Sequence, residues 1–356
     1  MTKTICFIAD AASPHSKKWV EICQELNWKL VVISHSAGEI NGATVIVQSM
    51  TLWGFPKYCW KVRRLLRELQ PDLIHAHQFG VHGLYAWFAN VAPIVISAWG
   101  SDIQVNPKRS LLLRWLVKFL IKKAVFITSV NHFITKELIR FGAKPEQILT
   151  FPIGISRQLY QQLSAKPIEN KTDLIICSPR LHEPLYNLSV ILEAFAKISS
   201  EFPTVELWML GEGSETLALK DYVATHQLDT RVKFWGQVEP EKAVELIAAS
   251  DLLVSIPKMD GTPVSLLEGL AGGTFPIVSN LPTYHDWIQS GVNGLIINPE
   301  PSELAQALRV GLTNFNLREQ AAHLNRSKVR ETALNEDYFR ILFEYYRRVV
   351  QPKCEL

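Results

Sequence analysis

The 356 residues exceed the size at which a single hydrophobic core stops growing, so we expect two domains. The composition, 47% hydrophobic and 20% charged, excludes long disordered tracts. Residues 1–150 hold 18 Lys or Arg against 9 Asp or Glu, and residues 151–356 hold 19 against 25, so the first half carries +9 and the second −6. This imbalance favours an anionic partner of the first half, such as lipid headgroups, a lipid-phosphate acceptor or nucleic acid.

The cysteine pattern predicts reduced thiols in a cytoplasmic protein, with no disulfide frame and no zinc site. The five cysteines are widely spaced and form no Cys-x-x-Cys pair: Cys6, Cys23, Cys59, Cys177 and Cys354. The first residues, MTKTICFIADAAS, are more typical of a first strand than of a signal peptide. The most apolar window, residues 111–128, is interrupted by four cations, so we expect no membrane-spanning helix.

Short β-branched runs alternate with longer amphipathic segments along the whole chain. The strands predicted in the first half are residues 5–9, 29–34, 44–47, 72–77, 93–97 and 125–129. Those predicted in the second half are residues 173–178, 205–210, 232–235, 251–256, 274–279 and 294–298. Helical segments lie between them, as at residues 187–199 and 303–310. Strands that are apolar on both faces and separated by helices indicate two α/β domains with doubly wound parallel sheets.

The predicted domains are residues 1–160 and 171–334, joined by a linker within residues 151–172, which hold two prolines and no strand pattern. A last helix, residues 335–349 of a C-terminal segment 335–356, is expected to pack back across the junction. Ligands of such sheets bind beyond the carboxyl ends of the strands, so we expect two domains that face each other across a cleft. The residues that follow strands are therefore the candidates for chemistry.

The strongest local motif, residues 259–271, follows the strand at 251–256. Pro263 suits the first turn of a helix, which places Asp260 in the preceding loop and Glu268 on the helical face of Val264. Free amides at such a helix start suit a diphosphate. Asp260 is placed to accept hydrogen bonds from sugar hydroxyls, and Glu268 from a ribose diol. A capped helix, in which Glu268 is exposed to solvent or lies at the edge of the core, explains the same sequence.

This motif resembles the signature of retaining glycosyltransferases of family 4, whose GT-B fold has two Rossmann-like domains. Their hallmark is two acidic residues that flank seven others, a spacing that Asp260 and Glu268 keep, with Asp where the family usually has Glu. The resemblance implies that Asp260 contacts the donor sugar, that Glu268 binds the nucleotide ribose and that Arg180 clamps the donor diphosphate. The family lysine that usually follows this arginine is missing from residues 185–187.

Further segments carry the resemblance over nearly the whole chain: residues 151–155, 210–215, 234–236, 279–280 and 291–295. The resemblance implies three catalytic residues, Asp260, Arg180 and Glu268. It implies the following set for the nucleotide sugar: Arg180, Gly211, Gly213, Gly236, Gly261, Thr262, Val264, Ser265 and Glu268.

The candidate acceptor site lies in the loops after the strands of the first half. Its predicted members are Ser13, His15, His75, His77, Trp99 and Asp102. Alternation along a strand aims His75 and His77 to the same side, toward an acceptor, although one packed histidine and one locally bonded histidine fit equally well. Trp99 stands where many family members have a histidine that touches the donor sugar. No Asp-x-Asp motif occurs, so we expect no metal, and no cofactor beyond the nucleoside-diphosphate sugar itself.

Two basic segments with aromatic residues, 57–64 and 106–123, predict a peripheral contact with the inner face of the cytoplasmic membrane. In the second segment Arg114, Lys118 and Lys122 recur every four residues on an otherwise apolar helix. Helices that pack on the core with one solvated face explain each segment equally well. No nucleic-acid-binding motif is present, so no nucleic-acid partner is expected.

These patterns predict an enzyme that moves a sugar from a nucleoside-diphosphate sugar to a hydroxyl acceptor, with retention and without a metal. The acceptor is expected to be lipid-linked or a polysaccharide, as in cell-surface polysaccharide or glycolipid synthesis. The resemblance also implies that the leaving phosphate accepts the acceptor's proton, so that no side chain serves as base. A nucleotide-sugar epimerase of the same fold and a non-catalytic sugar-nucleotide-binding protein are the alternatives.

Overall fold

The structure, a computed structural model, describes residues 2–48, 55–261 and 264–351 and divides the chain into two compact units. The first unit comprises Met1–Ile153 and Glu336–Leu356, and the second comprises Gly154–Asn335. The division after Ile153 falls within residues 151–172, the range of the predicted linker. Part of that range is a helix, α8 (Arg157–Ser164), which packs on α12 (Val264–Gly272) of the second unit.

The described strands of the first unit form one parallel sheet in the order β3-β2-β1-β4-β5-β6-β7. Their bounds are β1 Thr4–Ile8, β2 Lys29–Ser34, β3 Thr44–Val47, β4 Leu73–His77, β5 Ile94–Ala98, β6 Phe126–Ser129 and β7 Ile148–Thr150. The predicted strands of this half are confirmed. The edge strand β7 was missed because three residues are too short to show a period.

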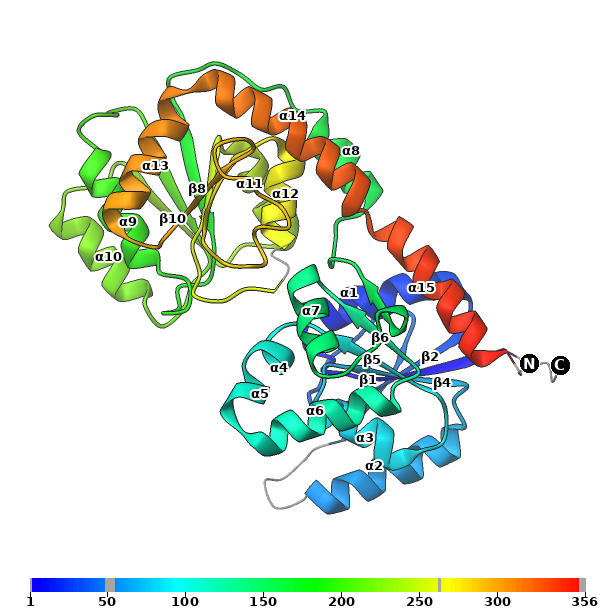
Figure 1. Ribbon diagram of the computed structural model, residues 1–356. Coiled ribbons are helices and arrows are strands. Elements are labelled where there is room, and N and C mark those ends of the chain that lie inside the picture. Colours follow the sequence, from blue (N-terminus) through cyan, green and yellow to red (C-terminus); the bar gives the residue numbers. More distant parts are fainter. Residues whose placement is uncertain (1, 49–54, 262–263, 352–356) are drawn as a thin grey trace. The chain divides into compact units, whose positions relative to one another are not determined.

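Helices cover both faces of this sheet (Figure 1). The helical segments are α1 Pro14–Ile22, η1 Cys23–Leu26, α2 Phe55–Leu69, α3 Val81–Ala89, α4 Ser101–Gln104, α5 Asn106–Arg109, α6 Leu111–Lys123, α7 His132–Arg140, η2 Pro145–Gln147 and α15 Asn335–Val350. On one face α3 packs against both α2 and α6. On the other, α1 meets α15, where the rings of Trp19 and Phe339 lie 5.2 Å apart. The chain's last helix thus completes the core of the first unit.

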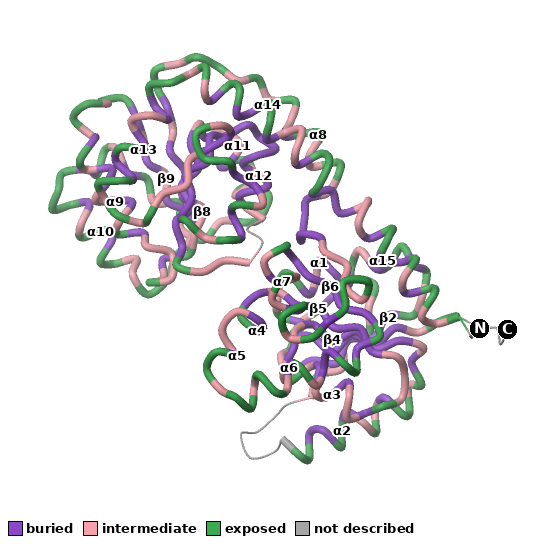
Figure 2. Tube along the Cα trace, in the orientation of Figure 1, coloured by how far each residue is buried: buried purple, intermediate pink, exposed green. Residues whose placement is uncertain are grey.

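The second unit repeats this architecture with a parallel sheet in the order β10-β9-β8-β11-β12-β13. Its strands are β8 Ile175–Pro179, β9 Glu206–Leu210, β10 Val232–Gly236, β11 Leu252–Ser255, β12 Phe275–Ser279 and β13 Leu295–Ile297. Its remaining helices are α9 Leu188–Ile198, α10 Thr216–Thr225, α11 Pro240–Ala249, α13 Pro301–Thr313 and α14 Phe315–Thr332. One buried cluster joins the sheet to α9, α10 and α13, and another joins it to α8, α11, α12 and α14. Figure 2 shows the buried strands enclosed by helices whose outer surfaces are exposed.

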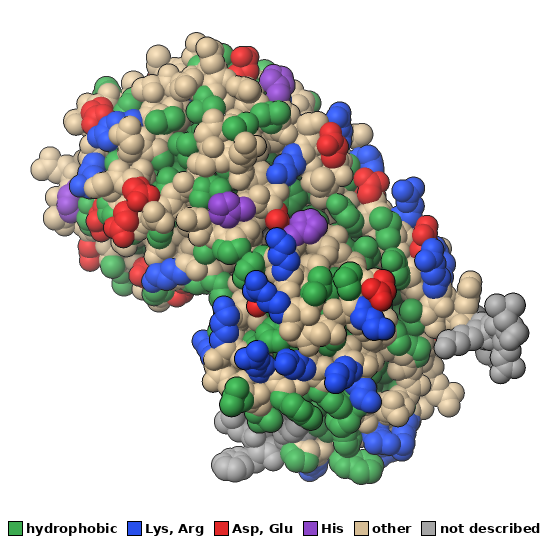
Figure 3. Space-filling view, viewed as in Figure 1, with side chains coloured by type: hydrophobic (Ala, Val, Ile, Leu, Met, Phe, Trp, Pro, Cys, Tyr) green, Lys and Arg blue, Asp and Glu red, His purple; other side chains and the backbone are tan. Residues whose placement is uncertain are grey.

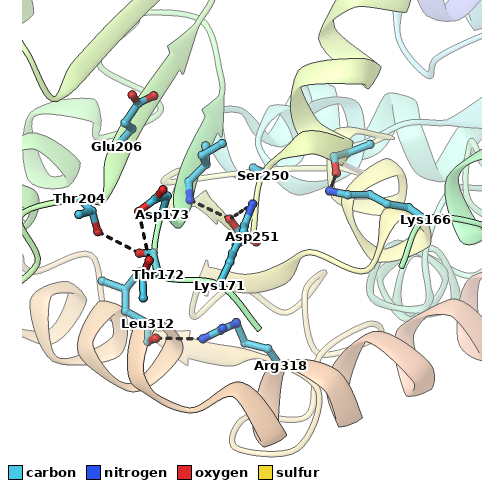
Figure 4. A network of polar contacts seen from close by, with 12 residues as sticks. Lys166, Lys171, Thr172, Asp173, Thr204, Glu206, Ser250, Asp251, Leu312 and Arg318 are labelled. Atoms are coloured by element: carbon cyan, nitrogen blue, oxygen red, sulfur yellow. Dashed lines mark hydrogen bonds and ion pairs between the residues drawn. The ribbon is translucent and has the colours of Figure 1, made fainter. Parts of the chain in front are cut away.

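A polar network closes the amino ends of β8 and β11 (Figure 4). Asp251 accepts a hydrogen bond of 2.8 Å from the Ile175 amide and pairs with Lys171 at 3.2 Å. Lys166 and Arg318 donate to backbone carbonyls, Arg318 to that of Leu312 at 3.0 Å. These cations already have partners within the fold, so we assign the network to structure rather than to ligand binding.

Each sheet has one point at which the strand order reverses, between β1 and β4 in the first and between β8 and β11 in the second. Loops on either side of such a point diverge, which leaves a crevice at the carboxyl ends of the strands. The two candidate sites lie at these switch points.

Candidate active site

Arg180 is the centre of the polar cluster at the second switch point. It follows β8 directly, and its Nε donates to Ser255 Oγ at the end of β11, at 2.9 Å. Its Nη2 contacts Asp260 Oδ2 at 2.5 Å and donates to the Tyr284 hydroxyl at 3.2 Å. Two segments far from Arg180 in the sequence, one with Ser255 and Asp260 and one with Tyr284, therefore fix its guanidinium.

The hydroxyl of Tyr284 joins the other members of this cluster. It donates to Asp260 Oδ2 at 3.0 Å and lies 3.1 Å from Ser255 Oγ. Burial opposes the charge of Arg180, but Tyr284 and Asp260 raise its pKa above the ordinary value, so it remains a cation. Burial likewise raises the pKa of Tyr284, which keeps its phenol protonated. Tyr284 was missed from the sequence because it lies in a loop without a strand or helix signal.

The loop at residues 211–214 packs tightly against the loop that carries Arg180. Gly211 has φ +89°, and a Cβ there would lie 2.9 Å from the Arg180 carbonyl oxygen. The Gly213 amide donates to Thr216 Oγ1, and the Ser214 amide donates to Glu183 Oε1, both at 2.9 Å. The glycines thus permit a close approach of the two loops, while the amides of Gly213 and Ser214 already have acceptors within the protein.

The other predicted donor-site residues lie on loops at the same end of the sheet or on α12. Gly236 ends β10, and its carbonyl accepts from the Gly211 amide at 2.8 Å. The Gly261 amide donates to Asp260 Oδ1 at 2.8 Å, and Thr262 lies outside the described residues. On α12 the described half-buried residues that were predicted for the donor are Val264, Ser265 and Glu268.

The first switch point holds a pocket of about 280 Å³. Three predicted acceptor residues, Ser13, His77 and Trp99, line it. Sequence reasoning missed the other lining residues, which are Asp10, Ser16, His35, Ser36, Gln78 and His82. Asp10 and His35 follow β1 and β2, so a strict search after each strand would have found them. The exposed His15 lies beside the pocket, with its ring 6.1 Å from that of Trp99.

Two further residues predicted for the acceptor, His75 and Asp102, do not line this pocket. Nε2 of the fully buried His75 lies 2.8 Å from Ser97 Oγ, and its Nδ1 lies 2.6 Å from the Tyr346 hydroxyl on α15. Both ring nitrogens are therefore used within the core. The buried carboxylate of Asp102 accepts from the amides of Gly100, Phe79 and Trp99, at 2.8, 3.0 and 3.2 Å. It holds the loop that carries Trp99.

An exposed surface of the first unit combines cations with large apolar side chains. On α6, Leu111 is 83% exposed and Trp115 60%, beside the exposed Arg114 and Lys118. Figure 3 shows lysines and arginines gathered with hydrophobic side chains over this part of the first unit. In the described residues no helix is long and apolar enough to cross a membrane.

Two Rossmann-like domains, each with one switch point in its sheet, form a fold of the GT-B type. Residues 4–131 match the family model of glycosyl transferase 4-like proteins, and residues 161–327 match that of glycosyl transferases group 1. The chain belongs to this family-4 type of glycosyltransferases.

Relatives with known roles are similar over most of the chain. The N-acetyl-alpha-D-glucosaminyl L-malate synthase of Bacillus anthracis is 24% identical over 71% of this chain and 69% of its own length. The phosphatidyl-myo-inositol mannosyltransferase of Mycobacterium tuberculosis is 25% identical over 76% of this chain and 72% of its own. The crystal structure of Anabaena HepE in complex with UDP shares the fold, with a TM-score of 0.79 and 17% identity over 98% of this chain and 100% of that one.

Proposed function

We propose that this protein transfers a sugar, with retention of configuration, from a nucleoside-diphosphate sugar bound by the second unit to a hydroxyl acceptor bound by the first. The observation that carries the proposal is the position of Arg180, fixed by Ser255, Asp260 and Tyr284 at the second switch point. A planar cation held in this way is oriented to pair phosphate oxygens.

In this proposal Arg180 stabilises the negative charge that develops on the diphosphate as the bond to the sugar breaks. Asp260 exchanges part of its contact with Arg180 for the donor sugar's hydroxyls, and Glu268 accepts from the ribose. The leaving phosphate takes the acceptor's proton, so no side chain serves as base and no metal takes part. Uracil is the first base to test, because the structure of HepE holds UDP.

The proposed acceptor is a glycolipid or a growing cell-surface polysaccharide reached at a membrane surface. The exposed apolar and cationic side chains of α6 support this, as does the similarity to a phosphatidyl-myo-inositol mannosyltransferase. Such a helix lies in the interface with its cations on the headgroups.

The deciding measurement is thermal stabilisation by a panel of nucleoside diphosphates and their sugars, because a ligand that binds only the folded state raises the melting temperature. One nucleotide is expected to stabilise the wild type and to stabilise Glu268→Ala and Arg180→Ala far less. Arg309→Ala, which removes a surface ion pair of the same unit, serves as control. If no nucleotide shifts the melting temperature of the wild type, the donor assignment is wrong.

Product analysis separates the proposed transfer from its two alternatives. A transferase releases nucleoside diphosphate only when an acceptor is present, and its product keeps the donor's anomeric configuration. An epimerase converts the donor without an acceptor, and a non-catalytic protein binds it without turnover. EDTA is expected to leave the transfer unchanged.

A further inference from the structure

A further pocket of the first unit, with a volume of about 530 Å³, opens at the amino ends of β5 and β6. Helices α2, α3 and α6, which lie side by side over one face of the sheet (Figure 1), form its walls. They contribute Arg63 from α2, Trp87 and Phe88 from the end of α3, and Lys123 from the end of α6. The other lining residues precede or begin the two strands. The volume lies within the usual range of small-molecule sites, so this α2–α3–α6 pocket is large enough for a ligand.

The α2–α3–α6 pocket lies at the opposite end of the sheet from the first switch point. Ile94 lines it and is the first residue of β5, whereas Trp99 follows that strand and lines the pocket at the switch point. The five residues of β5 span about 16 Å. A ligand of the α2–α3–α6 pocket is therefore not the reacting end of an acceptor, which binds beyond the carboxyl ends of the strands.

The charged residues that line this pocket are cations. They are the half-buried Arg63 and the exposed Lys123, and the described lining contains no acid. Neither cation forms an ion pair within the described part of the chain. Arg63 Nη1 donates to the Phe88 carbonyl at 3.4 Å, and the guanidinium carbon lies 5.3 Å from the centre of the Phe88 ring, which orients the planar group. Two cations without an acid favour an anion, and a guanidinium pairs the oxygens of a phosphate.

Exposed tryptophans lie on the two outer helices of this pocket. Trp60 on α2 is 63% exposed and Trp115 on α6 60%. The Trp60 ring lies 6.3 Å from that of Phe88 in the pocket wall. Trp115 stacks on Phe119 at 5.3 Å, and the Phe119 ring lies 4.9 Å from that of Trp87 in the wall. Each exposed tryptophan thus belongs to a row of rings that ends in the pocket, and tryptophans beside cations are typical of surfaces that lie in a membrane interface.

We propose that the α2–α3–α6 pocket holds the headgroup of one anionic phospholipid, with its phosphate paired by Arg63 and Lys123 and its acyl chains along the exposed tryptophans. An anionic lipid matches both the charge and the apolar surface, whereas a free phosphate ester matches only the charge. The lipid is bound and not consumed, because the pocket is remote from the carboxyl ends of the strands. The site differs from the surface contact proposed for α6, since Lys118 and Lys122 do not line it. It does not depend on the donor assignment.

The test is isothermal titration of the whole protein with dihexanoyl phosphatidylglycerol below its critical micelle concentration, so that no membrane surface is present. We expect a single molecule to bind per chain. Dihexanoyl phosphatidylcholine has the same chains but no net charge and should bind about tenfold more weakly. Glycerol 3-phosphate has the charge but no chains and should also bind about tenfold more weakly, or less tightly still.

Arg63→Gln with Lys123→Gln removes both cations of the lining. This double variant should bind dihexanoyl phosphatidylglycerol about 30-fold more weakly and lose the preference for it over phosphatidylcholine. Lys118→Gln with Lys122→Gln is the matched control, because it removes two exposed cations of α6 that lie outside the lining. The control should bind the soluble lipid within about twofold of the wild type, since salt screens exposed charges that do not touch the ligand.

The inference is wrong if the soluble anionic lipid does not bind, if the zwitterionic lipid binds as tightly, or if both double variants lose binding equally. Tight binding of glycerol 3-phosphate would also overturn it, because the site would then recognise a free phosphate ester. Nucleotide stabilisation is measured on the same preparations. Loss of lipid binding with intact nucleotide binding confirms that the variant is folded, whereas absence of nucleotide binding by the wild type removes the proposed function and leaves this inference standing.

Discussion

Arg180 and its three partners at the second switch point are paired with one another, whereas two buried ring nitrogens of residues that line the first pocket have no partner among the described residues. Around Arg180, the groups of Ser255, Asp260 and Tyr284 share a closed set of hydrogen bonds. Around the first pocket, His77 Nε2 and the Trp99 indole nitrogen are buried without a partner in the described part of the chain.

The paired cluster around Arg180 suits the diphosphate that we propose for the second unit. A diphosphate needs a cation whose position is fixed in advance, because reorganisation during the reaction would cost part of the stabilisation. The two sheets have the same strand order apart from the additional edge strand β7 of the first, so side chains at the switch points, rather than the fold, decide which ligand each unit takes.

The largest effect is expected for a substitution that disrupts the hydrogen-bonded cluster around Arg180. Arg180→Ala removes the one fixed cation that we assign to the leaving diphosphate and should lower kcat about 10²- to 10³-fold, which corresponds to about 3–4 kcal/mol. Steady-state release of nucleoside diphosphate in the presence of acceptor measures it. Arg309→Ala should stay within about twofold, since exposed ion pairs contribute little. A small loss in Arg180→Ala would show that another group stabilises the leaving charge.

Acid should weaken the first unit more than the second. Burial lowers the pKa of His75 from 6.5 to about 3. Below pH 6.5 the unfolded chain therefore binds a proton that the folded chain does not, so stability present above pH 6.5 is lost as the pH falls. Between pH 7 and pH 5, His75 alone should cost about 2 kcal/mol of unfolding free energy. His77 adds to this loss in the same direction.

Hydrogen exchange, corrected for the intrinsic effect of pH, resolves the two units. Peptides from β4 and β5 should lose protection on acidification before those from β8 and β11. Burial also lowers the pKa of His182 in the second unit, but that residue has no comparable group of buried histidines around it. Equal loss in both units would show that His75 and His77 do not dominate the acid response.

The fold was largely predictable from the sequence, whereas the pairing within the sites was not. Buried parallel strands are continuous apolar runs, so the predicted strands and the observed ones nearly coincide. The helix at 157–164 was missed because its sequence, RQLYQQLS, is mostly polar and Leu163 is its one buried residue. Asp260 was singled out in the loop after a predicted strand, and Arg180 through the family resemblance.

Contacts between residues far apart in the sequence could not be predicted from the local sequence pattern. His75 and His77 share one face of β4, as alternation predicts, yet one is used by α15 and the other lines a pocket. The difference depends on Tyr346, which lies 271 residues away along the chain. Tyr284 joins Arg180 across 104 residues, and no local period indicates either contact.

A membrane-binding experiment tests whether the cations on α6 of the first unit contact anionic lipids, in comparison with exposed lysines of the second unit. Each lysine near an anionic surface contributes about 1 kcal/mol, so Lys118→Gln with Lys122→Gln should weaken binding to phosphatidylglycerol vesicles about 30-fold. Sedimentation with vesicles measures this, and salt should weaken the wild type in the same direction. Lys233→Gln with Lys242→Gln, two exposed lysines of the second unit, is the matched control. Equal binding by both double variants would remove α6 as the membrane contact.

Tyr346→Phe tests the buried pairing beneath the first pocket. It leaves His75 Nδ1 without its partner and should lower the unfolding free energy of the first unit by about 1–2 kcal/mol. Tyr345→Phe is the control on the same helix, because this half-buried ring stacks on Phe126 and should change stability by less than about 0.5 kcal/mol. Denaturant unfolding followed by hydrogen exchange compares the two. Similar stabilities of the two variants would show that the hydrogen bond to His75 contributes little.

The smallest expected effect concerns Tyr284, which positions Arg180 and is not itself expected to touch the reacting atoms. Tyr284→Phe removes the hydroxyl that contacts Arg180, Asp260 and Ser255 but keeps the buried ring. Arg180 retains two of its partners, so kcat should fall about fivefold, which is the loss of one hydrogen bond of about 1 kcal/mol. Because the cation itself remains, affinity for the nucleoside diphosphate should change by less than twofold. A parallel loss of affinity and kcat would mean that the Tyr284 hydroxyl binds the donor directly and does not act through Arg180 alone.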